Sequence, residues 1–214
     1  MRKSLLLTAT AMATAMLVLS SAATALAATH GVLTTGKAGG PNVKVHAVLQ
    51  AGLKARTVVT FTQPGTTNSV KCTRSTFTTK VTANPARPGA AVTSLAALTF
   101  AGCKITFTGV RVLSLTVKVP ARTTISDARG KPVTVVRPSA TIKLRVGTST
   151  LSCTYTGRKI SGNASNIGSV ISFSKQVLTR SAGSTLCPAR GAFSATYGPV
   201  VDMSVRGHPH VFVN

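Results

Sequence analysis

Residues 153–197 read CTYTGRKISGNASNIGSVISFSKQVLTRSAGSTLCPARGAFSATY. The segment contains two cysteines, short runs in which apolar and polar residues alternate, and Gly, Asn, Ser or Pro at each break. Alternation with a period of two, bounded by turn residues, is typical of β-strands. The segment therefore predicts a β-module that is held together by a disulfide bond.

The rest of the chain repeats this pattern. Residues 92–100 are ambiguous, because Ser94-Leu-Ala-Ala-Leu98 fits one helical turn as well as a strand. With that exception the turns and alternating runs predict an all-β, single-domain fold, an antiparallel sandwich or a barrel-like structure. Leu, Val, Ile and Phe are expected to point inward, and Lys, Arg, Thr and Ser outward. The predicted strands are 43–49, 57–62, 69–74, 77–81, 105–109, 113–119, 133–136, 140–146, 151–155 and 211–213.

Four cysteines predict two disulfide bonds in an exported chain. Three pairings are open, and we expect Cys72–Cys103 and Cys153–Cys187 because each closes a similar loop within its own half. Zinc is the alternative, but no two cysteines have the spacing of a zinc finger. The loose similarity of the two cysteine-bounded halves also suggests two diverged copies of one unit.

The N-terminus predicts a secretory signal peptide over residues 1–28. Arg2 and Lys3 precede an apolar run, and Ala25-Leu26-Ala27 fits a cleavage site. An uncleaved anchor is the alternative, although the apolar run is shorter than the roughly 20 residues that a bilayer requires. We expect a flexible lead-in at 29–42 and a β domain at 43–214. The predicted location is extracellular, with no transmembrane segment after cleavage and with possible retention at the cell wall.

Charge is the most unusual property of the sequence. Lys and Arg number 25, against two acids, Asp127 and Asp202. Removal of Arg2 and Lys3 from the formal charge of +23 leaves +21. Such a charge attracts polyanions such as wall polymers, anionic lipids or nucleic acid, unless it only keeps the protein soluble. The candidate polyanion-binding residues are Lys118, Arg137, Lys143, Arg145, Arg158 and Lys159.

The sequence lacks the usual components of an enzyme. The two acids are too far apart in the chain to predict a carboxylate pair, and no G-x-S-x-G motif supports a Ser-His-Asp arrangement with Asp202. His208 and His210 could hold a metal only with a third ligand such as His30. We therefore expect a non-enzymatic protein with no cofactor and no metal.

Nucleic-acid recognition is also disfavoured by composition. Single-strand binders stack bases on aromatic side chains, and this chain has no Trp and only two Tyr. Sequence-specific readout is not expected, whereas nonspecific electrostatic contact stays open.

Several motifs in the C-terminal third point to a family. Cys153-Thr-Tyr-Thr156, Leu186-Cys-Pro188, GAFSATYGP at 191–199, Asp202 and Val211-Phe-Val-Asn214 resemble a group of small secreted proteins from Gram-positive actinobacteria. The group has no established biochemical activity. The resemblance implies export, disulfide bonds and a β-fold, and it implies no catalytic residues.

Together these observations predict a secreted, non-enzymatic β-protein whose basic surface binds an anionic cell-surface polymer. The alternative is a structural or protein-interaction module of the cell envelope whose charge is incidental.

Overall fold

The computed structural model describes residues 30–214, so the predicted signal peptide at 1–28 lies outside the described residues. All regular elements in the described part are β-strands, which confirms the predicted all-β class. The strands are β1 (Leu33–Thr35), β2 (Val48–Gly52), β3 (Val59–Thr62), β4 (Ser69–Ala83), β5 (Ala90–Ile105), β6 (Val110–Val117), β7 (Ala121–Ser126), β8 (Pro132–Val136), β9 (Ser139–Val146), β10 (Ser149–Thr156), β11 (Lys159–Ser165), β12 (Val170–Gly183), β13 (Arg190–Tyr197), β14 (Val201–Asp202) and β15 (Val211–Val213).

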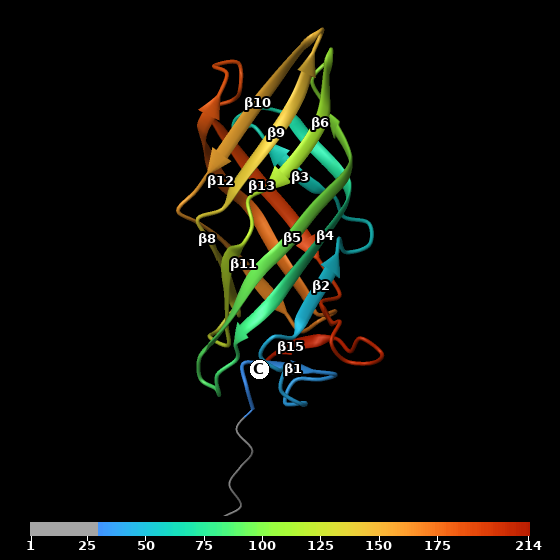
Figure 1. Ribbon diagram of the computed structural model, residues 1–214, viewed down its shortest axis with the longest axis vertical. Helices are drawn as coiled ribbons and strands as arrows, with labels where there is room; N and C mark the ends of the chain where they lie inside the picture. Colours follow the sequence, from blue (N-terminus) through green and yellow to red (C-terminus); the bar gives the residue numbers. More distant parts are fainter. Residues whose placement is uncertain (1–29) are drawn as a thin grey trace, which may run out of the picture.

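Eight strands close into an antiparallel barrel (Figure 1). The ring runs β3-β4-β5-β7-β8-β11-β12-β13 and returns from β13 to β3. Strand β2 pairs with the part of β4 that extends beyond β3, and β14 pairs with β2. Closure leaves the ring without a free edge, so its backbone donors and acceptors are paired within the barrel.

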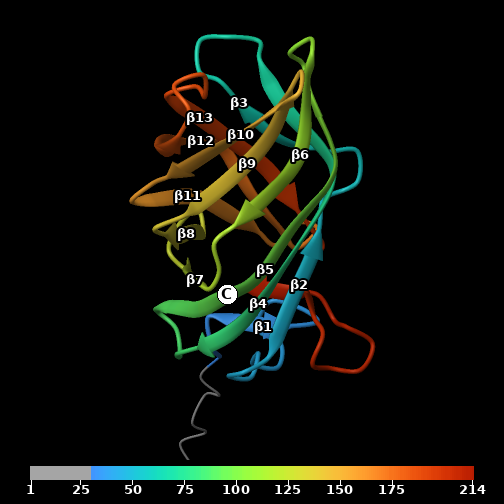
Figure 2. The ribbon, with the colours of Figure 1, turned by 45° about the horizontal axis from the view of Figure 1, so that its top comes forward.

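The long strands of the ring extend beyond it and carry a second sheet. Strand β10 pairs with residues 179–183 of β12, and β9 and β6 follow in order. Four loops gather at this end of the molecule in both views (Figures 1 and 2). We call this the loop end, and it comprises residues 63–68, 106–109, 147–148 and 184–189.

The opposite end, the floor, is closed by β1 and β15, which pair with each other across it (Figure 1). The Asn84 side chain accepts a hydrogen bond from Leu33 N and donates to Leu33 O and Val43 O. The Asn214 side chain donates to Gly31 O at 2.7 Å. Residues 30–42 are therefore a bound part of the fold, and the prediction of a flexible lead-in is wrong for them, because distant asparagines satisfy their backbone groups.

The longest strands contain bulges that explain where the strand predictions were imprecise. The predicted strands 69–74 and 77–81 form one strand, β4, whose inward phase changes between Cys72 and Ser75. In β5 a register shift opposite Thr78 and Thr79 places both Leu95 and Leu98 against the interior. A β-bulge inserts one extra residue, so these two inward residues are three positions apart instead of two. The same spacing is typical of a helical turn, which explains the ambiguity of the sequence here.

Both expected disulfide bonds are confirmed. Cys72 and Cys103 lie directly opposite each other on β4 and β5, and their disulfide crosses the pair. The second disulfide joins Cys153 on β10 to Cys187 in the loop between β12 and β13. Two disulfide bonds indicate an oxidising environment. The first links neighbouring strands and the second links a strand to a loop, and the duplication of the halves stays a prediction.

Candidate functional site

The barrel encloses an apolar cavity of about 130 Å³. Residues from all eight strands of the ring line it, and Leu33, Val211 and Val213 close it at the floor. An eight-stranded barrel has an interior that side chains just fill or that holds one small ligand. The cavity is therefore the first candidate for a binding site in the described part of the chain.

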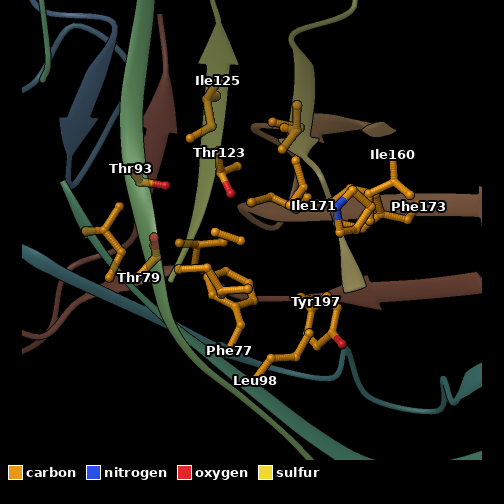
Figure 3. Close-up of a pocket in the computed structure, with 18 of the residues that line it drawn as sticks. Phe77, Thr79, Thr93, Leu98, Thr123, Ile125, Ile160, Ile171, Phe173 and Tyr197 are labelled. Carbon is orange, nitrogen blue, oxygen red and sulfur yellow. The ribbon is translucent and has the colours of Figure 1, made fainter. Parts of the chain in front are cut away.

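Three threonines bring hydroxyl groups into this apolar space (Figure 3). Thr79 comes from β4, Thr93 from β5 and Thr123 from β7, and Thr93 lies opposite Thr123 in the strand register. Thr93 is 1% exposed and Thr79 is 7% exposed. Neither of these two hydroxyls has a hydrogen-bond partner among residues 30–214. An unpaired buried hydroxyl lowers stability by about 1–3 kcal/mol, so two of them facing one cavity require an explanation.

The sequence analysis did not identify these threonines, because it placed Thr on the outer face of the strands. The signal was present in the alternation: Thr79 falls in phase with buried Phe77 and Val81, and Thr93 with buried Ala91. A threonine at an inward position of a strand is thus the pattern that predicts such a site.

A cluster of phenylalanines separates the cavity from a smaller pocket toward the loop end. Phe61 packs against Phe100 and Phe193, with ring centroids 5.9 and 5.2 Å apart. Phe61 and Leu178 line both spaces. The smaller pocket measures about 80 Å³ and also contacts Arg190. Among the described residues, no charged side chain lines the cavity, and Arg190 is the only charged residue that lines the smaller pocket.

Tyr197 forms one side of the cavity. Its ring packs edge-on against Phe77, and its hydroxyl is hydrogen-bonded to Ser75 Oγ at 3.0 Å. Burial raises the pKa of Tyr197 to about 12, and the hydrogen bond with Ser75 acts in the opposite direction. Burial also raises the pKa of Tyr155, while the charge of Arg180 lowers it.

The Tyr197 pKa predicts a loss of stability in strong alkali. The neutral phenol stabilises the fold fully below the ordinary pKa of 10.0, and this contribution disappears as the pH rises to about 12. The free energy of unfolding should fall by about 3 kcal/mol over this range from this group alone. Urea unfolding of the native protein and of Tyr197→Phe measures the difference. Equal pH slopes for the two proteins would contradict the assignment.

The six predicted polyanion-binding residues are all exposed, and the structure divides them into two groups. Lys118, Arg137, Arg158 and Lys159 lie where three connections cross from the second sheet to the barrel, a group we call the waist cluster. Here Lys118 N donates to Ser139 O and Arg137 N donates to Arg158 O, each at 2.9 Å. Lys143 and Arg145 lie apart from them on β9.

Other residues considered from the sequence do not come together. Asp127 pairs with Arg87 at 3.5 Å and accepts a hydrogen bond from Gly89 N, whereas Asp202 is buried beside β2. Among residues 30–214, no three His, Cys, Asp or Glu side chains are grouped to hold a metal ion. In the same residues, no helix has the length and apolar character needed to cross a membrane.

Comparison with known proteins gives no assignment, since no family model, curated protein or solved structure matches the chain. The resemblance to the actinobacterial group stays a prediction. The cavity and the charged surface are therefore the features that bear on function.

Proposed function

We propose that this protein binds a small, uncharged, apolar molecule inside its barrel. The observation that carries the proposal is the pair of buried hydroxyls, Thr79 and Thr93, that face the cavity and have no hydrogen-bond partner in the described part of the chain. A ligand with one hydrogen-bonding group would satisfy them and would recover the energy that their burial costs. Apolar walls with a few convergent polar groups are the usual construction of a small-molecule site.

The cavity also defines the chemistry of the ligand. Its volume is close to that of an engineered cavity of about 150 Å³ that binds benzene, so one aromatic ring or a short branched chain fits. No charged side chain lines it among the described residues. A carboxylate would therefore be buried without a counter-ion, which costs far more than a neutral hydroxyl or carbonyl. The expected ligand class is small alcohols, phenols and ketones.

Phenol and toluene provide a matched pair of probes, because they differ mainly in one hydroxyl. We expect calorimetry to show that the native protein binds phenol, and that Thr79→Val with Thr93→Val weakens phenol binding about tenfold, which corresponds to the loss of about 1.4 kcal/mol of hydrogen bonding. Toluene affinity should change by no more than about twofold. Benzoate should not bind, because its charge has no partner in the cavity.

The valine variant also has an internal control. Without ligand it should be at least as stable as the native protein, since valine has the shape of threonine and leaves no unpaired hydroxyl. Ala121→Leu, which places a larger side chain on the cavity wall, should weaken phenol and toluene alike. Parallel losses for the two probes in the valine variant would refute the role of the hydroxyls, and no binding of either probe to the native protein would refute the proposal.

A second candidate function, contact with an anionic wall polymer, is favoured by the waist cluster. Arg137 and Arg158 line a shallow surface hollow, and Lys159 lies beside them. Retention of the purified, oxidised protein on isolated cell wall at low salt, with release at high salt, would support this function. Exchange of the four waist cations for glutamine should abolish retention. Unchanged retention of that variant would remove the support.

A further inference from the structure

The loop end combines uncharged tips with exposed apolar side chains. Phe107, in the loop between β5 and β6, is 54% exposed, and Leu186, between β12 and β13, is 75% exposed. The four loops at this end, residues 63–68, 106–109, 147–148 and 184–189, contain no Lys, Arg, Asp or Glu. Figures 1 and 2 place these loops together at one end of the elongated molecule. Phe107 and Leu186 therefore contribute little to the core and face outward on neutral tips.

Cations begin immediately behind these tips and face each other in like-charged pairs. Lys71 on β4 lies directly opposite Lys104 on β5, and Arg111 on β6 lies directly opposite Arg145 on β9. All four side chains are exposed. Like charges directly opposite each other on neighbouring strands are destabilising. Two such pairs at one end are a local cost that an anionic partner would relieve.

No acid moderates this charge. Within residues 30–214, Arg87 is the only cation that forms an ion pair. Its partner, Asp127, follows β7 and contacts Gly89 in the turn between β4 and β5, which lies at the floor. The other acid, Asp202, is buried. The loop end is thus positively charged without compensation and is complementary to an anionic surface.

We propose that the loop end docks on an anionic lipid bilayer. In this arrangement Phe107 and Leu186 enter the boundary between headgroups and acyl chains, while Lys71, Lys104, Arg111 and Arg145 meet the anionic headgroups. When the loop end enters a bilayer from water, the apolar tip reaches the acyl chains, and the cations behind the tip lie at the level of the anionic headgroups. A soluble anionic polymer would engage the cations but would leave the apolar tips in water. This inference goes beyond cavity binding and does not depend on it.

Vesicle sedimentation of the purified, oxidised protein tests the docking. The native protein should sediment with vesicles of phosphatidylcholine and phosphatidylglycerol, and not with vesicles of phosphatidylcholine alone. Phe107→Ser with Leu186→Ser should lower partitioning to the mixed vesicles by about tenfold or more. Glutamine at Lys71, Lys104, Arg111 and Arg145 should lower it by roughly a hundredfold or more.

Matched controls come from the floor, the far end of the molecule. Ile167 is 88% exposed in the turn between β11 and β12, so Ile167→Ser removes an apolar side chain that is more exposed than Phe107 or Leu186. Arg129→Gln with Arg206→Gln removes exposed floor cations. These controls should sediment like the native protein. The proposal is overturned if Phe107→Ser with Leu186→Ser binds mixed vesicles as well as Ile167→Ser does. It is also overturned if loop-end and floor cations contribute equally to partitioning. Either result would mean that the protein is attracted to the vesicles by charge alone. Phenol binding by the same variants should be unchanged.

Discussion

Replacement of Cys153 and Cys187 by alanine is expected to lower the free energy of unfolding by about 4 kcal/mol. The disulfide closes a loop with a sequence separation of 34 residues, and loop closure of this size in the unfolded chain accounts for that amount. For a chain of this length the melting temperature should fall by roughly 8–16 °C. Thermal unfolding of the native protein and of the double variant measures the loss.

The position of this disulfide predicts which part of the fold will loosen. Strand β10 connects β9 and β6 to the barrel, and Cys153 anchors β10 to the loop that follows β12. Amide exchange should therefore accelerate in β6, β9 and β10. Cys72→Ala with Cys103→Ala is the matched control, with a loop separation of 31 and a similar expected cost, but its cysteines lie within the long β4–β5 pair. Identical exchange patterns in the two variants would contradict this account.

Asn84→Ala should have the second-largest effect, a loss of about 3 kcal/mol or more. The Asn84 side chain makes three hydrogen bonds of 2.8–2.9 Å, to both backbone groups of Leu33 and to Val43 O. Alanine leaves Leu33 N and Val43 O without these partners, whereas Leu33 O still accepts a hydrogen bond from Val43 N at 3.0 Å. Each unpaired buried group costs about 1–3 kcal/mol. Because Leu33 lines the cavity, the floor should open and phenol affinity should fall together with stability. Urea unfolding and calorimetry measure the two effects.

Asn68→Ala is the control for this substitution. Asn68 lies in the turn between β3 and β4, and its side chain makes no hydrogen bond within the described residues. Its replacement should change stability by no more than about 0.5 kcal/mol. A loss for Asn84→Ala as small as that of Asn68→Ala would mean that β1 does not depend on this side chain.

The sequence predicted the class of fold and most strands because their signals are local. Alternation at 140–146 matches β9, and the turn residues around 84–89 mark the end of β4. The disulfide pairing followed from loop lengths alone. Alternation predicted a strand over 43–49, but β2 begins only at Val48. The Val43 carbonyl accepts a hydrogen bond from the Asn84 side chain and not from a neighbouring strand of a sheet.

The inward phase of Thr79 and Thr93 is a local signal, whereas the cavity that they face depends on the closure of the whole barrel. Thr79 and Thr93 lie on the consecutive, paired strands β4 and β5, but the cavity that they face exists only once β12 and β13 close the ring. Bulges also change which residues face inward, so alternation alone does not predict the inward residues of β5 beyond Leu95. The high positive charge, in contrast, follows directly from the composition of the sequence. That Lys71 lies opposite Lys104 follows only from the strand register of the structure.

The scarcity of acids in this fold has a consequence for the conditions that it withstands. Most proteins unfold in acid because many carboxylates must take up protons. This chain has Asp127 and Asp202 as its only acidic side chains, and four histidines, so a change from neutral to strongly acidic medium alters few charges. Ionic strength, which screens the repulsion among the lysines and arginines, is the stronger variable. Acidic surroundings should therefore leave the barrel intact, whereas dilution into salt-free water should destabilise it.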